Sequence, residues 1–239
     1  RKENSWESNQ TFNPAAIYEA GNVHLLYRAI GDNGLSVVGY ASSRDGTTIK
    51  DRSSKPAFVA FQNEQYPRVM TRIEYSSGGS WGGCEDPRLV RIGDRIFMTF
   101  VAFDGWGSVR MALSSIDLND FLAQKWKWKK PILISPPWEV NKNWVLFPEK
   151  IKGKYAILHS LSPKILVDYL DNLDTLDDLP FIKSHYARTP HKRRWDSWVR
   201  GAGPPPIKTK YGWLLLYHAM DESDPNRYKL GAMILSADN

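Results

Sequence analysis

The residue types best suited to chemistry stand together in one acidic string, Glu85-Asp86-Pro87-Arg88. Adjacent carboxylates on an extended chain point to opposite faces, so only one of the two can enter a given pocket. Proline restricts the residue before it, so we expect Asp86 to be extended and its carboxylate to have a defined direction. Arg88 then lies on the same face as Asp86 and could pair with it. The string fits either a pocket with one ordered carboxylate or a turn held by an Asp–Arg salt bridge.

A second set of candidate residues is basic. Lys150 and Arg200 each stand just upstream of a β-rich run, and these two runs end in His159 and His218. Two cations and two imidazoles could form an anion clamp, because Lys and Arg bind anions through charge-assisted hydrogen bonds. Gly201 would allow the backbone to approach closely beside Arg200. The alternative is that Lys150 and Arg200 are solvated surface residues.

The elements that must position these residues form an internal repeat. Its copies begin at glycines that lie 59 to 72 residues apart: Gly21, Gly93, Gly153 and Gly212. Each copy is a β-rich run, a polar turn and a second β-rich run, which predicts a β-hairpin. Strand-rich repeats of this period, with no amphipathic helical pattern between them, favour a β-propeller over a sandwich. We expect little helix, a turn or so within residues 115–122, and turns between blades at residues 135–137 and 203–206.

Three polar residues occupy nearly equivalent places in the repeat. Arg28, His159 and His218 stand at the end of the first run of their copies. If the first strands of a propeller line its central channel, these side chains converge on one mouth of it. The alternative is that each residue caps a strand in a separate blade. We favour a shared site because three copies carry a polar residue at the same place.

Length and composition are those of an ordinary globular protein. The 239 residues are 42% hydrophobic and 24% charged, and no apolar run approaches the ~20 residues that span a bilayer. The single cysteine, Cys84, excludes an internal disulfide framework and a zinc site built from cysteines. No signal-peptide pattern opens the sequence, so we expect a soluble, cytoplasmic protein without a membrane partner.

Ten tryptophans and a formal net charge of +6 suit ligands with flat apolar faces or negative charge. The block 124–130 alternates Trp with Lys and could be a nucleic-acid or glycan platform. A strand edge with Trp126 and Trp128 on one face explains the block better, since lysine commonly protects such edges. We therefore rank a nucleic-acid-binding module last and expect no nucleic-acid partner.

Seven strings, taken in order along the chain, together resemble the mannoside phosphorylases of glycoside hydrolase family 130. The strings are Phe12-Asn-Pro-Ala15, Leu26-Tyr-Arg-Ala29, Ser43-Arg-Asp-Gly46, Glu85-Asp-Pro-Arg88, Leu146-Phe-Pro-Glu-Lys-Ile151, Gly201-Ala-Gly-Pro-Pro-Pro206 and Leu216-Tyr-His218. The resemblance implies an all-β, five-bladed propeller, with residues 1–239 as a single catalytic domain. On this resemblance we expect four blades within the sequence, with the last blade of the family's propeller missing at the C-terminus. The strand edges that a missing blade exposes would favour a homo-oligomer.

The same resemblance implies roles for individual residues. Asp86 is the general acid and acts through the mannosyl 3-hydroxyl, while Asn13 and Arg44 hold the mannosyl unit. The residues expected to bind phosphate are Lys150, Arg200 and His218. The remaining candidates for substrate binding are Arg28, Asp45, Glu85, Arg88, His159 and Tyr217. The implied reaction converts a β-mannoside and inorganic phosphate into α-mannose 1-phosphate and a shortened acceptor, with no metal or organic cofactor.

Phosphorolysis also agrees with the residue types. An inverting hydrolase needs a second carboxylate, roughly 6.5–9.5 Å from the acid, to activate water. Phosphate is already an anionic nucleophile, so an inverting phosphorylase instead needs cations that hold and aim it. One ordered aspartate with a basic cluster therefore favours phosphorolysis. The alternatives are a β-mannoside hydrolase on the same fold and a non-catalytic glycan-binding propeller.

Overall fold

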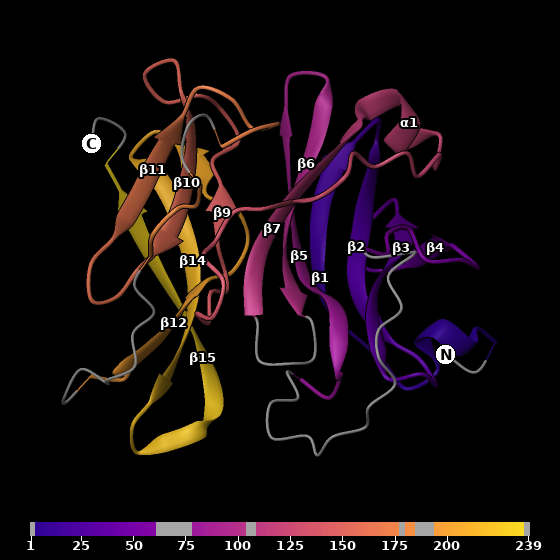
Figure 1. The fold of residues 1–239 in the computed structure, drawn as a ribbon, viewed down its shortest axis with the longest axis horizontal. Helices are drawn as coiled ribbons and strands as arrows, with labels where there is room; N and C mark the ends of the chain where they lie inside the picture. The colour runs from indigo at the N-terminus through magenta and orange to yellow at the C-terminus, as the bar shows by residue number, and fades with distance from the viewer. Residues whose placement is uncertain (1–2, 61–77, 104–108, 177–179, 185–193, 237–239) are drawn as a thin grey trace. The chain divides into compact units, whose positions relative to one another are not determined.

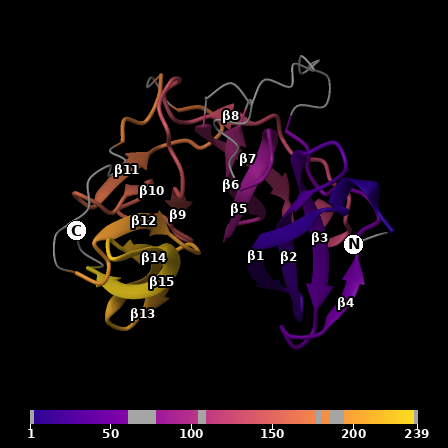
Figure 2. The same cartoon turned by 90° about the horizontal axis from the view of Figure 1, so that it is seen from below.

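The structure is a computed structural model that describes residues 3–60, 78–103, 109–176, 180–184 and 194–236. The chain divides into two compact units, residues 1–140 and 141–239. Among the described residues, the regular secondary structure of each unit is almost wholly β-strand (Figure 1, Figure 2). Within the described ranges, no helix is long and apolar enough to cross a membrane.

The first unit contains one eight-stranded sheet. Its strands are β1 (Gln10–Glu19), β2 (Asn22–Ile30), β3 (Leu35–Ser43), β4 (Ile49–Arg52), β5 (Gly82–Ile92), β6 (Arg95–Phe103), β7 (Val109–Asp117) and β8 (Ile132–Leu133). Paired strands run antiparallel, except that β3 meets β5 in a short parallel contact at residues 35–36 and 82–83. The sheet therefore consists of two antiparallel groups, β1–β4 and β5–β8, joined by that contact.

The core of the first unit lies between these two groups of strands. Leu26 and Val38 from the first group belong to one buried hydrophobic cluster with Met98 and Phe100 from the second. Burying an apolar side chain of this size contributes about 1.5–3 kcal/mol, so the cluster holds the groups together. Two short helices complete the unit, η1 (Ser5–Glu7) and α1 (Leu118–Leu122). The helix α1 begins where the Asp117 carboxylate accepts hydrogen bonds from two backbone amides of its first turn.

The second unit contains two smaller sheets. One has the order β11-β10-β9, and in the other β14 pairs with each of the remaining strands. The strands are β9 (Val145–Leu146), β10 (Tyr155–Ser160), β11 (Leu166–Leu170), β12 (Trp198–Ala202), β13 (Ile207–Thr209), β14 (Gly212–Asp221) and β15 (Asp224–Leu235). Phe147 and Leu158 of the first sheet pack with Trp213 and Leu215 of the second. These contacts give the unit a core of its own.

The four predicted hairpins are confirmed as β2–β3, β6–β7, β10–β11 and β14–β15. Each is preceded by another strand, β1, β5, β9 or β12, which pairs with the first strand of the hairpin. The first strand of each hairpin is therefore paired on both sides, which the sequence did not indicate. The turn of the second hairpin, residues 104–108, lies outside the described residues. The all-β prediction is confirmed, and the number of blades stays a prediction.

Two expectations about connecting segments were wrong. Residues 203–206 join β12 to β13 within one sheet rather than joining two blades. Residues 124–130 form no strand, although Trp126 and Trp128 pack against the core as expected. The indole Nε1 of Trp128 donates to the carbonyl oxygen of Ala57 at 3.0 Å. Both indoles thus serve the packing of the first unit, which argues against a nucleic-acid platform.

A cluster around Tyr27 anchors the start of the chain to the first sheet. Trp6 stacks on the Tyr27 ring at a centroid distance of 6.5 Å, and the Tyr27 hydroxyl donates to Glu7 Oε2 at 2.8 Å. Arg52 donates to the Tyr27 hydroxyl and to Glu7 Oε2. Gly39 leaves room for the ring, because a Cβ there would lie 2.4 Å from it. Burial alone would raise the pKa of Glu7, but the hydrogen bonds to its carboxylate outweigh burial and lower that pKa.

The same arrangement recurs in the second unit around Tyr217. Trp195 stacks on the Tyr217 ring at 6.1 Å, and the hydroxyl donates to Asp196 Oδ2 at 2.9 Å. Arg194 pairs with Asp196 through two hydrogen bonds of 2.8 and 3.0 Å. A Cβ at Gly231 would lie 2.3 Å from the ring. The copies of the internal repeat therefore share individual buried contacts as well as the order of their strands.

Replacing Tyr27 by phenylalanine tests what this cluster contributes. The change removes one donor from the buried Glu7 carboxylate, so Tyr27→Phe should lower the free energy of unfolding by about 1–3 kcal/mol. Urea titration of the wild type and the variant measures the difference. Tyr18 is 67% exposed, and Tyr18→Phe should change stability by less than about 0.5 kcal/mol. If both substitutions had equally small effects on stability, the Tyr27 hydroxyl would not stabilise the fold through Glu7.

Candidate active site

Asn13 and Asp86 lie at two matching β-bulges. Asn13-Pro14 interrupts the pairing of β1 with β2, and Asp86-Pro87 interrupts the pairing of β5 with β6. Both polar residues have a positive φ, 46° and 50°, which Asn and Asp tolerate better than most residues. The expectation of an extended Asp86 was therefore wrong, because the bulge takes it out of the strand conformation and re-aims its side chain. Bulges and strained backbone of this kind cluster at functional sites.

The guanidinium of Arg28 holds both carboxylates of the acidic string. Its Nη2 donates to Glu85 Oε1 at 3.0 Å, and its Nη1 lies 3.4 Å from Asp86 Oδ1. Further hydrogen bonds join its Nε to Ser36 Oγ at 2.8 Å and its Nη2 to Ser80 Oγ at 2.9 Å. The expectation that the two carboxylates face opposite sides fails because the bulge breaks the alternation of the strand. Arg28 and Glu85 are 2% and 0% exposed, whereas Asp86 is 18% exposed.

Asp86 is the member of this network that reaches solvent. Its Oδ1 accepts a hydrogen bond of 2.8 Å from Asn13 Nδ2 in addition to the contact with Arg28. Arg88 donates through Nη1 to the backbone carbonyl oxygen of Asp86 at 3.0 Å, in place of the side-chain pair that we expected. Burial lowers the pKa of Arg88 to about 10, and the Asp86 carboxylate opposes that shift. Arg88 is therefore charged at neutral pH, beside a carboxylate whose direction is fixed by two strands.

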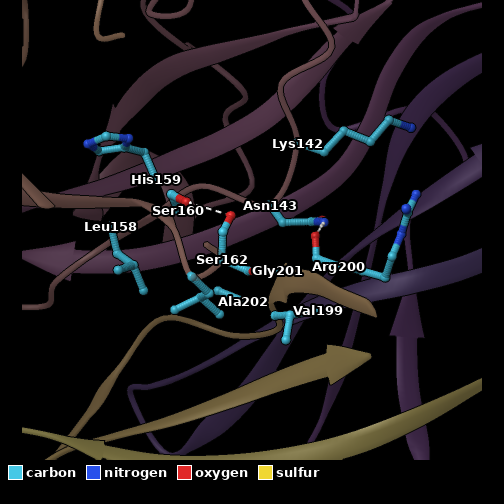
Figure 3. Close-up of a pocket in the computed structure, with 11 residues that line it drawn as sticks. Lys142, Asn143, Leu158, His159, Ser160, Ser162, Val199, Arg200, Gly201 and Ala202 are labelled. Carbon is cyan, nitrogen blue, oxygen red and sulfur yellow. Dashed lines mark hydrogen bonds between the residues drawn. The ribbon is translucent and has the colours of Figure 1, made fainter. Parts of the chain in front are cut away.

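A pocket in the second unit gathers basic and polar side chains. Lys142, Asn143, His159 and Arg200 line it, together with backbone and apolar groups of β10 and β12. Figure 3 shows Lys142 and Arg200 extending in the same direction, with His159 on the other side of the pocket. Two cations near one pocket favour an anionic ligand.

Arg200 owes its position to a third bulge. The pairing of β12 with β14 shifts register between Val199 and Gly201, so Arg200 is the extra residue. The backbone carbonyl of Arg200 accepts a hydrogen bond of 2.8 Å from Asn143 Nδ2, and the same nitrogen lies 3.5 Å from His218 Nε2. Arg200 and His218, which the sequence predicted to act together, are thus linked through Asn143.

Of the other predicted site residues in the second unit, Lys150 and Tyr217 do not line the pocket, whereas His159 does. Lys150 is exposed, and its Nζ lies 4.3 Å from the centre of the Tyr155 ring at the start of β10. His159 stands near the opposite end of that strand and lines the pocket. Tyr217 belongs to the buried cluster described above rather than to the pocket. It adjoins His218 on β14, and neighbouring residues of a strand point to opposite faces.

Arg44 and Asp45 lie in the turn that follows β3 and are exposed. The pairing of β2 with β3 sets Ser43 opposite Val23 and Val38 opposite Arg28. The turn is therefore at the end of the hairpin remote from Arg28, about 17 Å along the strands at 3.3 Å per residue. Hydrogen bonds from the backbone amides of Thr48 and Thr47 hold the pKa of Asp45 well below its usual range. The structure does not bring Arg44 and Asp45 to Asp86, and the role visible for Asp45 is to hold the turn.

The whole chain matches one protein family. Residues 2–239 fit the model of glycoside hydrolase family 130, which is described as beta-1,4-mannooligosaccharide phosphorylase. The chain belongs to glycoside hydrolase family 130. The resemblance inferred from the seven sequence strings is thereby confirmed.

Two relatives from Thermoanaerobacter sp. strain X514 match almost all of this family-130 chain. A protein named 1,2-beta-oligomannan phosphorylase is 38% identical over an alignment of 250 positions that covers 100% of this chain and 73% of that protein. A second, named Beta-1,2-mannobiose phosphorylase, is 33% identical and covers 98% of this chain and 72% of its own length.

A solved structure supports the same fold. It was reported with the statement that family 130 contains glycoside hydrolases that target β-1,2 mannosidic linkages in Candida mannan. The match covers 98% of this chain and 69% of that one, with a TM-score of 0.68 and 24% sequence identity. At that identity the likeness concerns the fold alone.

Sequence reasoning missed Lys142 and Asn143. The signal available was their place immediately before Trp144 and the buried strand β9, at the entrance of the string that carries Lys150. Lys150 attracted the prediction because it stands inside that string, whereas the structure sets Lys142 on the pocket. Within the described residues, no three His, Cys, Asp or Glu side chains are arranged to hold a metal ion.

Proposed function

We propose that this chain catalyses the inverting phosphorolysis of β-mannosides and yields α-mannose 1-phosphate and a shortened acceptor. The observation that carries the proposal is the match, over 98–100% of this chain, to two proteins that are both named as phosphorylases of β-1,2-linked mannosides. The family model is described by a β-1,4 linkage instead. The family description covers many proteins, whereas the two relatives are individual proteins that align with almost all of this chain. We therefore take β-1,2-linked mannobiose as the first substrate to test.

In the proposed reaction Asp86 is the general acid. Its carboxylate is partly exposed, while the Arg28 guanidinium and the Asn13 amide bind its Oδ1 and set its direction. A general acid must be aimed at the oxygen that leaves, directly or through one bridging hydroxyl. In this assignment Asn13 and Arg28 position the acid, and the exposed edge of Asp86 meets the mannosyl unit.

The state of Glu85 supports phosphorolysis over hydrolysis. An inverting hydrolase needs a second carboxylate that can reach and deprotonate a water molecule. Glu85 adjoins the acid in sequence, but it is fully buried and bound to Arg28 and Ser80. It is therefore unsuited to activate water at the anomeric carbon. Phosphate needs no such base because it brings its own negative charge.

The basic pocket of the second unit supplies the anion-binding function in this proposal. Lys142 and Arg200 provide charge, and His218, whose Nε2 lies 3.5 Å from Asn143 Nδ2, provides a ring nitrogen. A cation held by a bulge and a hydrogen-bonded amide, as Arg200 is, can aim phosphate without reorganising during the reaction. Lys142 takes the place that the sequence assigned to Lys150.

The decisive experiment measures the phosphate dependence of turnover. With β-1,2-mannobiose, we expect α-mannose 1-phosphate to accumulate with added phosphate, detected by ³¹P NMR, and no mannose release without it. Equal mannose release with and without phosphate would replace this proposal by a β-mannoside hydrolase. Binding of mannobiose by calorimetry without turnover in either condition would indicate a glycan-binding protein.

A further inference from the structure

The orientation of the Asn143 amide follows from its neighbour. The carbonyl oxygen of Arg200 can only accept a hydrogen bond, and it lies 2.8 Å from the terminal amide of Asn143. The atom of Asn143 that faces it must therefore be the nitrogen Nδ2, since the amide oxygen would set two acceptors against each other. This argument assigns the amide from hydrogen-bond chemistry alone.

That orientation in turn constrains His218. The same Nδ2 lies 3.5 Å from His218 Nε2, and an amide NH₂ has two hydrogens and no lone pair to offer. One hydrogen serves the Arg200 carbonyl, which leaves only a hydrogen, and no lone pair, to offer to the imidazole. A hydrogen on Nε2 would set two donors against each other, so Nε2 is the unprotonated nitrogen. The neutral ring then carries its proton on Nδ1.

The local backbone keeps Asn143 in this orientation. Asn143 has a φ of 67°, and Gly201 opposite it has a φ of 135°. A Cβ at Gly201 would lie 2.6 Å from the Asn143 Cβ, so the glycine leaves room for the asparagine. Both residues adopt conformations that most L-residues avoid. The bulge at Arg200 and the amide of Asn143 thus form one unit.

We propose that Asn143 is a positioning residue that holds His218 as the neutral tautomer protonated at Nδ1. Resting on the proposed function, the consequence is that His218 meets phosphate as a neutral hydrogen-bond donor through Nδ1. The positive charge at the site then comes from Lys142 and Arg200. A neutral donor adds direction to the binding of the anion without adding charge.

Histidine ¹⁵N NMR tests the tautomer without any substrate. The chain has five histidines, and His218→Gln identifies the signals of His218 by their loss. In the wild type at neutral pH, long-range ¹H–¹⁵N spectra should show a bare Nε2 and a protonated Nδ1. Because neutral imidazole in water favours the proton on Nε2, this is the less common pattern. A protonated Nε2, or a doubly protonated ring, would overturn the proposal.

Two variants of Asn143 test whether its amide determines the tautomer of His218. Asn143→Ala removes the amide, so the His218 signals should shift toward the Nε2-protonated pattern, and Asn143→Asp offers an acceptor and should shift them further. Exposed Asn172 supplies the control, since Asn172→Ala should leave them unchanged. If the Asn143→Asp variant does not fold, the Asn143→Ala spectrum decides. An unchanged His218 pattern in a folded Asn143→Ala variant would refute the role of Asn143.

Kinetics separate this inference from the proposed function. Losing one hydrogen bond that orients a charged ligand costs about 1.5 kcal/mol, so Asn143→Ala should raise the KM for phosphate about tenfold. If the wild type showed no phosphate dependence, the proposed reaction would fail and the tautomer result would still stand. If the wild type were phosphate-dependent with the proton on Nε2, the reaction would stand and this inference would fail.

Discussion

Asp86→Asn should lower the rate of phosphorolysis of an unactivated β-mannoside by about 10²- to 10⁴-fold, the usual contribution of a general acid. The asparagine oxygen can still accept from Asn13 and Arg28, so the network around the site is kept while the transferable proton is lost. The measurement is kcat for β-1,2-mannobiose at saturating phosphate. Thermal unfolding of the variant should match that of the wild type.

An activated substrate shows whether the lost function is proton donation. An aryl β-mannoside with a strongly acidic phenol as leaving group needs no proton to depart. The Asp86→Asn variant should therefore retain most of the wild-type rate with that substrate and phosphate. A loss as large as that with mannobiose would mean that Asp86 binds the sugar rather than protonates the leaving oxygen.

Arg28→Met should lower the free energy of unfolding by about 3–5 kcal/mol, because it leaves a buried carboxylate without its cation. Glu85 is 0% exposed and Arg28 is 2% exposed, so water cannot replace the lost partner. Urea or thermal unfolding measures the change. Arg91 pairs with Glu19 at 2.6 Å but is 44% exposed, and Arg91→Met should cost less than about 1 kcal/mol.

The double variant Arg28→Met with Glu85→Met distinguishes the effect of breaking the ion pair from the effect of losing the Arg28 side chain itself. Replacing both members of a buried ion pair by apolar side chains is often neutral, so the double variant should recover much of the stability lost by Arg28→Met. If the double variant were as unstable as the sum of the two single variants, the ion pair would not be the reason for the loss. Activity should stay low in both, since Asp86 loses the guanidinium that aligns it.

The parts of the site carried by short strings could be predicted from the sequence. Asp86 stands out as an acidic residue before proline, and Arg28 stands at a repeated position near the end of a strand. Their contact could not be predicted, because it depends on bulges that put Asn13 and Asp86 outside strand geometry. Period-2 alternation assumes an unbroken strand, and a bulge shifts every facing direction after it.

For the basic pocket, the residue types in the sequence did not identify which lysine lines it. Lys150 and Lys142 are both lysines near β9, and residue type gives no means of choosing between them. The choice depends on the chain between β8 and β9, which has no regular period from which a direction could be read. Asn143 could not be predicted from the sequence, because its side chain binds the backbone carbonyl of Arg200. A contact with the backbone does not depend on the type of the partner residue, so no motif indicates it.

The two groups of strands in the first unit meet along a seam that Arg28 crosses. Arg28 belongs to β2, whereas the carboxylates that it binds belong to β5. At this seam β3 and β5 pair over two residues, and Gly83 sits where a methyl group would lie 2.1 Å from the Ser36 carbonyl oxygen. We expect slight loosening of this seam on warming to tilt Asp86, the proposed general acid, before either group of strands frays. Turnover would then fade at temperatures where the β-structure is still whole, and we expect the junction between β3 and β5 to limit the heat tolerance of catalysis.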